Sequence, residues 1–386
     1  MMIDPGTIDE KELQGIDFAV LSGMKPVEEV SKSDILACPP GEYPIVEDML
    51  AYINKHKDDP YSEISFDDLS VNGKVVQDTM EEYLKDRSIS SGNLKEALKT
   101  PLHFLYDYNQ VFEEKDKSHF ELGTFAHMAF LEPELFDKVA VAPEVSLATK
   151  DGVIRMINFF QELKGEKPSF FDDWKMQELK ERLADEKAKC QFQIIQPEHK
   201  IIIDVLKKHY YNYGGGILQY LFKGAKSETS FYGIDEATGL NLRVRPDAFN
   251  IEENIGVNAV ISLKTTRCDS IGKFAYDFGK LKYELSEGMY QEVMSNVTGR
   301  KFNVTIMVML QTVPPYSPAV LWLGPDTLQL GKYKFHYALS VVKECNEKDF
   351  FPGFDSKAEM GNNGIIMFDG PQWSFREEHP TDIDDE

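Results

Sequence analysis

The chain has 386 residues, of which 42% are hydrophobic and 28% charged, so its composition is that of a globular protein and excludes a disordered chain or a coiled coil. Its 65 acidic residues outnumber 42 basic ones and give a formal net charge of -23, which excludes indiscriminate binding to phosphate backbones through bulk charge. The four cysteines form no closely spaced pair, and no apolar run approaches the roughly 18 residues of a membrane span, so we expect neither a zinc ribbon, nor a disulfide framework, nor a membrane protein.

The first part of the chain, residues 1–85, is acidic and of mixed pattern, and we predict an N-terminal extension with short helices, for example over 46–55. Its start lacks the basic and apolar regions of a signal peptide, so the expected location is the cytoplasm. The main domain is predicted over 86–350. A C-terminal segment, 351–386, ends in an acidic tail.

Helical patterns dominate from residue 90 to about 210. Ser90 and its polar neighbours form a cap before a short amphipathic helix over 94–98. Residues 125–131 form a strongly apolar helix that contains one histidine, His127, and Pro133 marks its end. Further helices with charged faces are predicted over 174–189 and 200–209.

The pattern changes from helical to alternating near residue 228. Strands are predicted over 228–234, 240–249, 257–265, 302–311 and 319–323, and helices over 270–297 and 325–345. A turn over 236–239 makes a hairpin of the first two strands. We therefore predict an α/β fold with a central mixed sheet of about five strands flanked by helices.

Two carboxylates and a lysine stand out on these strands. Asp247 follows Pro246, and Lys264 ends the run Ser262-Leu263-Lys264 on the next strand, so both would point into one cleft. Side chains alternate along a strand, which puts Ser262 and Lys264 on the same face. With Glu228 at the start of the preceding strand, this set suits phosphodiester hydrolysis assisted by Mg²⁺ or Mn²⁺, in which the carboxylates hold the metal and the lysine serves the attacking water.

Four segments in this order resemble one nuclease family. Pro246-Asp247 followed by Ser262-Leu263-Lys264 is similar to the motif of the PD-(D/E)xK nuclease superfamily. Residues 122–133, 262–266 and 283–290 narrow the resemblance to the branch of RecE (exonuclease VIII) and lambda exonuclease. The similarity spans roughly residues 88–300, and it implies a restriction-endonuclease-like core.

The resemblance also implies roles. The metal would be held by His127, Glu228, Asp247, the residue at 262 and the carbonyl of Leu263, and Lys264 would serve the water. The family's activity is degradation of linear double-stranded DNA from the 5′ end, in recombination or phage-type DNA processing. The 3′ overhangs that it leaves serve a single-strand annealing partner. Its members form ring-shaped homo-oligomers, so such an assembly is expected here.

Two positions depart from the family pattern. Ser262 stands where the motif has an acid, and Ser286 where the helix motif has glutamine. A neutral hydroxyl is a poor ligand beside a carboxylate. Three hypotheses stay open: the site works with its remaining ligands, a carboxylate such as Glu287 or Asp269 has replaced the missing one, or the site is inactive.

The stretch around the motif also predicts DNA contact. Residues 220–282 hold nine basic and eight acidic side chains and are nearly neutral in an acidic chain. Basic side chains there can face phosphates, which predicts a steep loss of DNA binding with salt. The predicted contacts are Arg243, Arg245, Thr265, Thr266, Arg267, Lys273, Ser286 and Tyr290.

Three functions follow in order of preference. The first is a metal-dependent exonuclease of the RecE-like type. The second is a nuclease-fold DNA-binding or assembly protein that has lost catalysis, as Ser262 suggests. The third is an RNA-directed or small-molecule enzyme on the same scaffold, because a fold does not fix a function.

Overall fold

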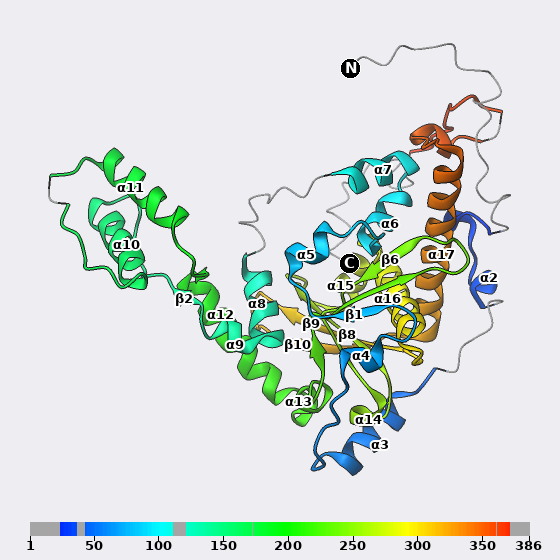
Figure 1. The fold of residues 1–386 in the computed structure, drawn as a ribbon, viewed down its shortest axis with the longest axis horizontal. Coiled ribbons are helices and arrows are strands. Elements are labelled where there is room, and N and C mark those ends of the chain that lie inside the picture. The colour runs from blue at the N-terminus through cyan, green and yellow to red at the C-terminus, as the bar shows by residue number, and fades with distance from the viewer. Residues whose placement is uncertain (1–23, 37–42, 111–120, 172, 360, 371–386) are drawn as a thin grey trace, which may run out of the picture.

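The computed structural model describes residues 24–36, 43–110, 121–171, 173–359 and 361–370. Its centre is a five-stranded mixed sheet in the order β10-β9-β8-β7-β4, in which β8 and β9 are parallel and the other pairs antiparallel. The strands are β4 (Lys226–Ser227), β7 (Ala248–Asn250), β8 (Ala259–Thr266), β9 (Val304–Gln311) and β10 (Pro318–Trp322). The predicted fold class is confirmed, and β8 is the central strand (Figure 1).

A second, antiparallel sheet consists of β1 (Lys74–Val76), β5 (Ser230–Ile234) and β6 (Asn241–Val244), with β5 in the middle. The chain crosses between the two sheets twice, from β4 to β5 and from β6 to β7. The predicted strand 240–249 is therefore divided between the sheets as β6 and β7, while the predicted strand 228–234 corresponds to β5 alone.

The two crossings lie side by side. The backbone N–H of Glu228, in the first crossing, donates to the carbonyl of Asp247, in the second, at 3.0 Å. Glu228 has a φ of 50°, in the left-handed region that residues with side chains rarely adopt. Pro246 has no N–H to give a strand ladder, which favours a break there. The crossings thus bring two acidic residues to one place.

One face of the five-stranded sheet is covered by α16 (Tyr283–Thr298), and α17 (Pro325–Lys348) packs on α16. They approach so closely that a Cβ at Gly288 would lie 2.5 Å from the backbone nitrogen of Lys332, so only glycine fits. Buried side chains of α16, such as Leu285 and Met289, pack with Val260 of β8 in one core cluster. This packing fixes α16 over the central strand.

Helices from four parts of the chain cover the opposite face: α3 (Val46–His56), α8 (Glu121–Leu131), α12 (Pro197–Asn212) and α13 (Ile217–Leu221). Ala126 of α8 and Leu206 of α12 pack against Ile261 and Leu263 of β8. Since successive strand residues face opposite sides, Ser262 and Lys264 face α16 while their neighbours face α8.

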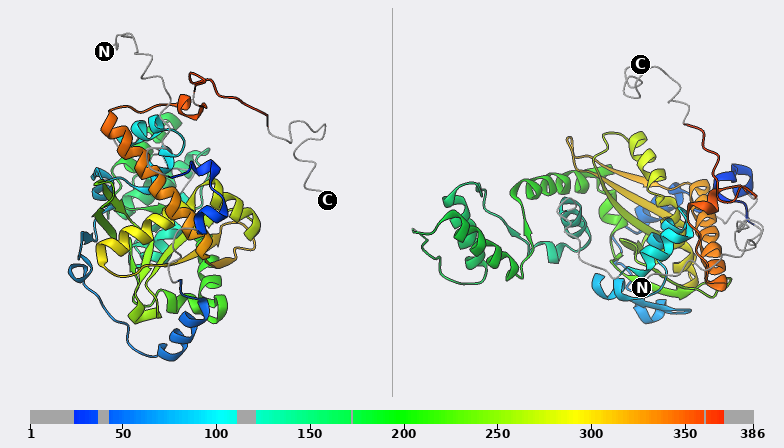
Figure 2. Two further views of the ribbon diagram at one scale, coloured as in Figure 1. Left: turned by 90° about the vertical axis from the view of Figure 1, so that its right-hand side faces the viewer. Right: turned by 90° about the horizontal axis from the view of Figure 1, so that it is seen from above.

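An arm projects from the body between α9 (Pro133–Phe136) and α12 (Figures 1 and 2). It starts and ends in a two-stranded parallel sheet of β2 (Ala140–Val141) and β3 (Ile194–Ile195). Between these strands, α10 (Lys150–Leu163) and α11 (Met176–Ala188) pack on each other around their own apolar core.

Shorter elements complete the described chain. They are η1 (Val27–Glu29), α2 (Lys32–Leu36), α4 (Phe66–Leu69), α5 (Met80–Lys85), α6 (Ser91–Ala97), α7 (Pro101–Asn109), η3 (Tyr213–Gly215), α14 (Glu252–Ile255), α15 (Ile271–Lys280) and η4 (Phe354–Lys357). Leu69 and Val75, within the predicted extension 1–85, belong to the main core cluster. The predicted acidic tail lies outside the described residues, and within them no helix is both long and apolar enough to cross a membrane.

Candidate metal centre

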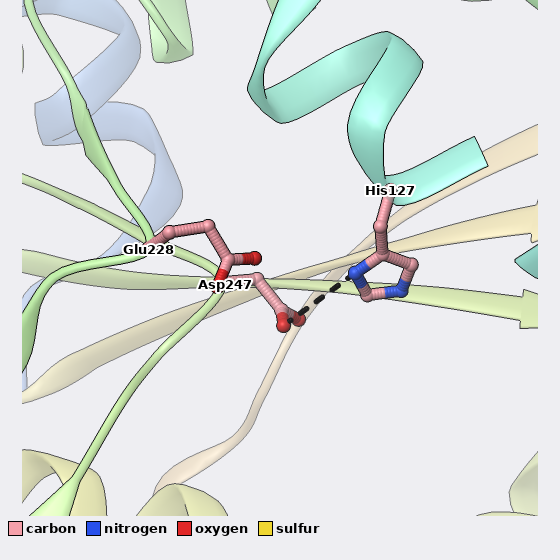
Figure 3. Close-up of side chains that lie close together, drawn as sticks. All are labelled: His127, Glu228 and Asp247. Carbon is pink, nitrogen blue, oxygen red and sulfur yellow. Dashed lines mark ion pairs between the residues drawn. The ribbon is translucent and has the colours of Figure 1, made fainter. Parts of the chain in front are cut away.

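Three side chains converge beside the crossings between the sheets. His127 comes from α8, Glu228 from the link between β4 and β5, and Asp247 from the residue before β7 (Figure 3). One ligand atom from each lies within 4.8 Å of the others, and Nδ1 of His127 is 3.7 Å from Oδ1 of Asp247. In the described part of the chain this is the one group of three or more His, Cys, Asp or Glu side chains with that spacing.

Asp247 is held by the central strand. The backbone N–H of Leu263 donates to Oδ2 of Asp247 at 2.6 Å, and Nζ of Lys264 donates to the same oxygen at 2.9 Å. The antiparallel pairing of Ala248 with Ile261 sets this contact, because it places the end of the second crossing against the end of β8. The motif lysine and the motif aspartate therefore form one ion pair.

The negative charge of Asp247 and the positive charge of Lys264 stabilise each other. Burial alone would raise the pKa of Asp247, but Lys264 and His127 hold it below its ordinary value. Burial would lower the pKa of Lys264, but Asp247 and Glu287 outweigh it and raise that pKa. Both groups are charged near neutral pH.

Glu228 has a different environment. Burial raises its pKa, against the opposing effect of Arg245, whose Nε donates to Oε2 of Glu228 at 3.0 Å. Nη1 of Arg245 also donates to Oδ1 of Asp78 at 2.8 Å. The guanidinium of Arg245 thus holds the carboxylate of Glu228 in place, and this carboxylate stays close to Asp247.

His127 is suited to be a neutral ligand. Burial lowers the pKa of its imidazole, although Asp247 acts in the opposite direction. A neutral imidazole has a free nitrogen lone pair, which a metal requires. Two carboxylates and one imidazole form a donor set that suits Mg²⁺ or Mn²⁺, so these three residues fit the expected metal.

The residue at the acidic position of the motif, Ser262, is completely buried. Its Oγ donates a hydrogen bond of 2.8 Å to Oε1 of Glu287, which lies on α16 and is also completely buried. Burial raises the pKa of Glu287 to about 7, against the effects of Lys264 and this hydrogen bond. The other proposed replacement, Asp269, is exposed and pairs with Lys273 at 3.1 Å.

A second lysine, which sequence reasoning missed, lies beside the centre. Nζ of Lys95, on α6, is 5.3 Å from the centre of the Tyr283 ring, and Nζ of Lys264 is 5.7 Å from the same ring. Burial lowers the pKa of Lys95 to about 8, although Glu287 opposes this. No sequence signal marks Lys95, because it joins the site only through the packing of α6 on α16.

The predicted DNA contacts fall into two groups. Four of them are engaged inside the protein. Arg243 is buried and donates to the carbonyls of Tyr83 and Asp86, and Arg245 holds Glu228 as described. Ser286 is buried with its Oγ 3.2 Å from that of Ser91, and Tyr290 packs at the edge of the main core cluster.

The second group lies at the open end of the central strand. Thr265 and Thr266 end β8 and are half-buried, while Arg267 and Lys273 beyond them are exposed. Lys280, the last residue of α15, is also exposed. This end of β8 carries Lys264 and continues into the segment that contains Arg267 and Lys273, and contact of these residues with DNA stays a prediction.

Comparison with known proteins supports the resemblance to the PD-(D/E)xK superfamily, and the narrower resemblance to the RecE-like branch stays a prediction. Residues 90–362 match the sequence model of a protein family, DUF3799, which is described as a PDDEXK-like domain of unknown function. The chain matches no curated protein.

Two solved structures are similar to the chain. One, from Eubacterium rectale and proposed in its name to be an exonuclease, has 13% identity and a TM-score of 0.43, over 77% of this chain and 96% of that one. The other, SSO0001, has 14% identity and a TM-score of 0.21, over 67% of this chain and 87% of that one. These similarities are too weak to assign an activity.

Proposed function

The chain belongs to the PDDEXK-like family DUF3799, and on this premise we propose that it is a metal-dependent nuclease that hydrolyses phosphodiester bonds of DNA. The observation that carries the proposal is the convergence of His127, Glu228 and Asp247 within 4.8 Å, with Lys264 paired to Asp247 at 2.9 Å. Carboxylates beside an imidazole and a lysine form a set that binds a divalent cation and a phosphate together.

Each residue then has a defined task. Glu228, Asp247 and His127 would hold Mg²⁺ or Mn²⁺, together with the carbonyl of Leu263. The bound metal supplies charge neutralisation at the phosphate and an acidified water. Lys264 keeps its ammonium beside the attacked phosphate, where it orients the water and stabilises the developing negative charge.

The test is a digestion assay on the whole chain. Linear duplex DNA labelled at either end is incubated with the protein and Mg²⁺ or Mn²⁺, with a chelator in a parallel reaction. Metal-dependent loss of one end label establishes an exonuclease and gives its polarity. Loss of neither label, in the presence of either metal, contradicts the proposal.

The finer form of the proposal is an exonuclease that acts from 5′ to 3′ on double-stranded DNA ends. The resemblance of residues 122–133 and 283–290 to the RecE-like branch supports this form, as well as a ring-shaped homo-oligomer and a single-strand annealing partner. Native mass measurement tests the oligomer. Competition between DNA and RNA tests the nucleic acid.

A second candidate is a nuclease-fold protein that binds DNA without cutting it. Ser262 at the acidic motif position favours this reading. It predicts that a gel-shift assay shows DNA binding while the digestion assay shows no cleavage. Digestion created or greatly raised by Ser262→Asp would identify the natural chain as a weakened nuclease.

A further inference from the structure

A buried acid faces the position where the motif lacks one. Ser262 and Glu287 have no exposed surface, and they are joined by the hydrogen bond of 2.8 Å from Oγ to Oε1. The serine at position 262 is shorter than the acidic residue of the motif. The longer side chain of Glu287 extends from α16 to contact it. The carboxylate of Glu287 occupies the neighbourhood of the missing one.

Ser262 lies on the face of β8 that also carries Lys264, next to the candidate metal centre. Ser262 and Lys264 share one face of β8, and Lys264 reaches Asp247. Glu287 acts electrostatically on Lys264, and both Asp247 and Lys95 act on Glu287. The acid on α16 therefore neighbours Lys264 of the motif, while its carboxylate lies outside the group of His127, Glu228 and Asp247 whose ligand atoms are within 4.8 Å of one another.

The hydrogen bonding of Glu287 is incomplete. Its second oxygen, Oε2, is buried and has no hydrogen-bond partner among the described residues. A buried carboxylate is costly unless cations and hydrogen-bond donors satisfy it. Lys264 already donates to Asp247, so it does not fully supply that need. A neutral glutamine could accept the same hydrogen bond from Ser262 at lower cost, and the acid therefore requires another reason.

We propose that Glu287 supplies, from α16, the metal-binding carboxylate that the motif lacks at residue 262, and that Ser262 is a positioning residue that orients it. This inference rests on the proposed nuclease function for the identity of the metal. Asp269, the alternative acid, is exposed and pairs with Lys273, so it has neither the burial nor the contact with Ser262.

The experiment measures Mn²⁺ binding to the whole chain by titration calorimetry, with no DNA present. The variants are Glu287→Gln, the double variant Glu287→Gln with Ser262→Asp, and Asp269→Asn as a matched control. Glutamine keeps the shape and the acceptor for Ser262, so a purely structural role for Glu287 survives the first change. Thermal unfolding in chelator accompanies each titration.

The expected result is a loss of at least about tenfold in Mn²⁺ affinity for Glu287→Gln and no change for Asp269→Asn. The double variant should recover most of the affinity, because it returns a carboxylate to the motif position. In chelator, Glu287→Gln should unfold at the same temperature as the natural chain or higher, since it removes a buried charge.

Equal Mn²⁺ affinity in Glu287→Gln and the natural chain would overturn the inference, even if the natural chain digests DNA. Conversely, binding that depends on Glu287 in a chain that digests nothing would keep the inference and defeat the proposed function. Anomalous scattering from Mn²⁺-soaked crystals of the natural chain decides the matter if a variant does not fold. Coordination by Glu287 supports the inference, and a manganese ion without it overturns the inference.

Discussion

Arg245 donates a hydrogen bond of 3.0 Å to Glu228 across the two crossings that join the sheets. The guanidinium is almost completely buried, with 8% of its side chain exposed, and it also bonds Asp78. An arginine in the motif segment therefore serves the protein's own carboxylates. Its task is to fix the left-handed residue Glu228, whose φ is 50°.

Replacing Arg245 by methionine should destabilise the chain strongly. The change leaves the carboxylates of Glu228 and Asp78 buried without their cation, which costs about 3–5 kcal/mol in comparable cases. Urea unfolding in chelator measures this. Saturating Mn²⁺ should return part of the loss, because it gives Glu228 a new positive partner. A change below about 1 kcal/mol would contradict the positioning role.

Replacing Lys264 by alanine should abolish DNA cleavage while the fold is kept. We expect a rate loss of about 10²–10⁴-fold, the usual contribution of one catalytic group of this kind. Circular dichroism and Mn²⁺ titration serve as controls, and both should show a folded chain that binds metal. A Lys264→Ala protein that still cuts at the natural rate would defeat the assigned role.

Replacing Lys95 by methionine should stabilise the chain at pH 7 and weaken digestion. Burial holds the pKa of Lys95 at about 8 when folded, below its ordinary value, so its charge costs stability wherever it is protonated in both states. The gain should be about 1–3 kcal/mol at neutral pH and should fade as pH rises above 8. Urea unfolding at a series of pH values checks the trend. An unchanged digestion rate would show that Lys95 takes no part in handling the phosphate.

His336 of α17 should stabilise the chain only in acid. It pairs with Glu292 of α16 at 2.6 Å, and although burial lowers the pKa of this histidine, Glu292 raises it overall. A raised folded pKa gives stability that is present below about pH 6.5 and is lost as pH rises through the folded pKa. His336→Gln should therefore cost up to about 1 kcal/mol near pH 6, since the pair is partly exposed, and nothing near pH 9. Equal effects at both pH values would contradict this.

DNA binding should depend steeply on salt through the exposed segment after β8. Each phosphate contact contributes about 0.7–0.9 to the slope of log affinity against log salt. Arg267→Ala and Lys273→Ala should each reduce that slope by about one contact. Lys180→Ala, at an exposed position on the arm, is the matched control and should leave the slope unchanged. A slope near zero for the natural chain would exclude phosphate contact here.

Period and spacing in the sequence were enough to predict the elements that carry His127 and Lys264, whereas Asp247 lies between β6 and β7 and not within a strand. The predicted helix around His127 is α8, and the predicted strand 257–265 is the central strand β8. The structure brings His127, Glu228 and Asp247 together, and their binding of a metal stays a prediction. Alternation alone did not show that the predicted strand 240–249 divides between two sheets. It records which side chains are buried, not which neighbour a strand pairs with.

The roles of individual charged residues were harder to predict from the sequence than the positions of helices and strands. A count of basic residues could not show that Arg243 and Arg245 are engaged inside the protein, because their partners Tyr83, Asp86 and Asp78 precede the motif by more than a hundred residues. The position of Lys95 beside the metal centre could not be predicted for the same reason. Partners brought in by tertiary packing leave no local mark in the sequence.

The arm lies in the chain between α8 and α12, and its base is continuous with the cluster that supports His127. Phe125 and Ala129 of α8 pack with Ile195, at the end of the arm, and with Ile203 of α12. The helix that carries His127 is therefore held in place partly by the residues at the base of the arm, so a substitution that disturbs this apolar cluster should also disturb the metal centre.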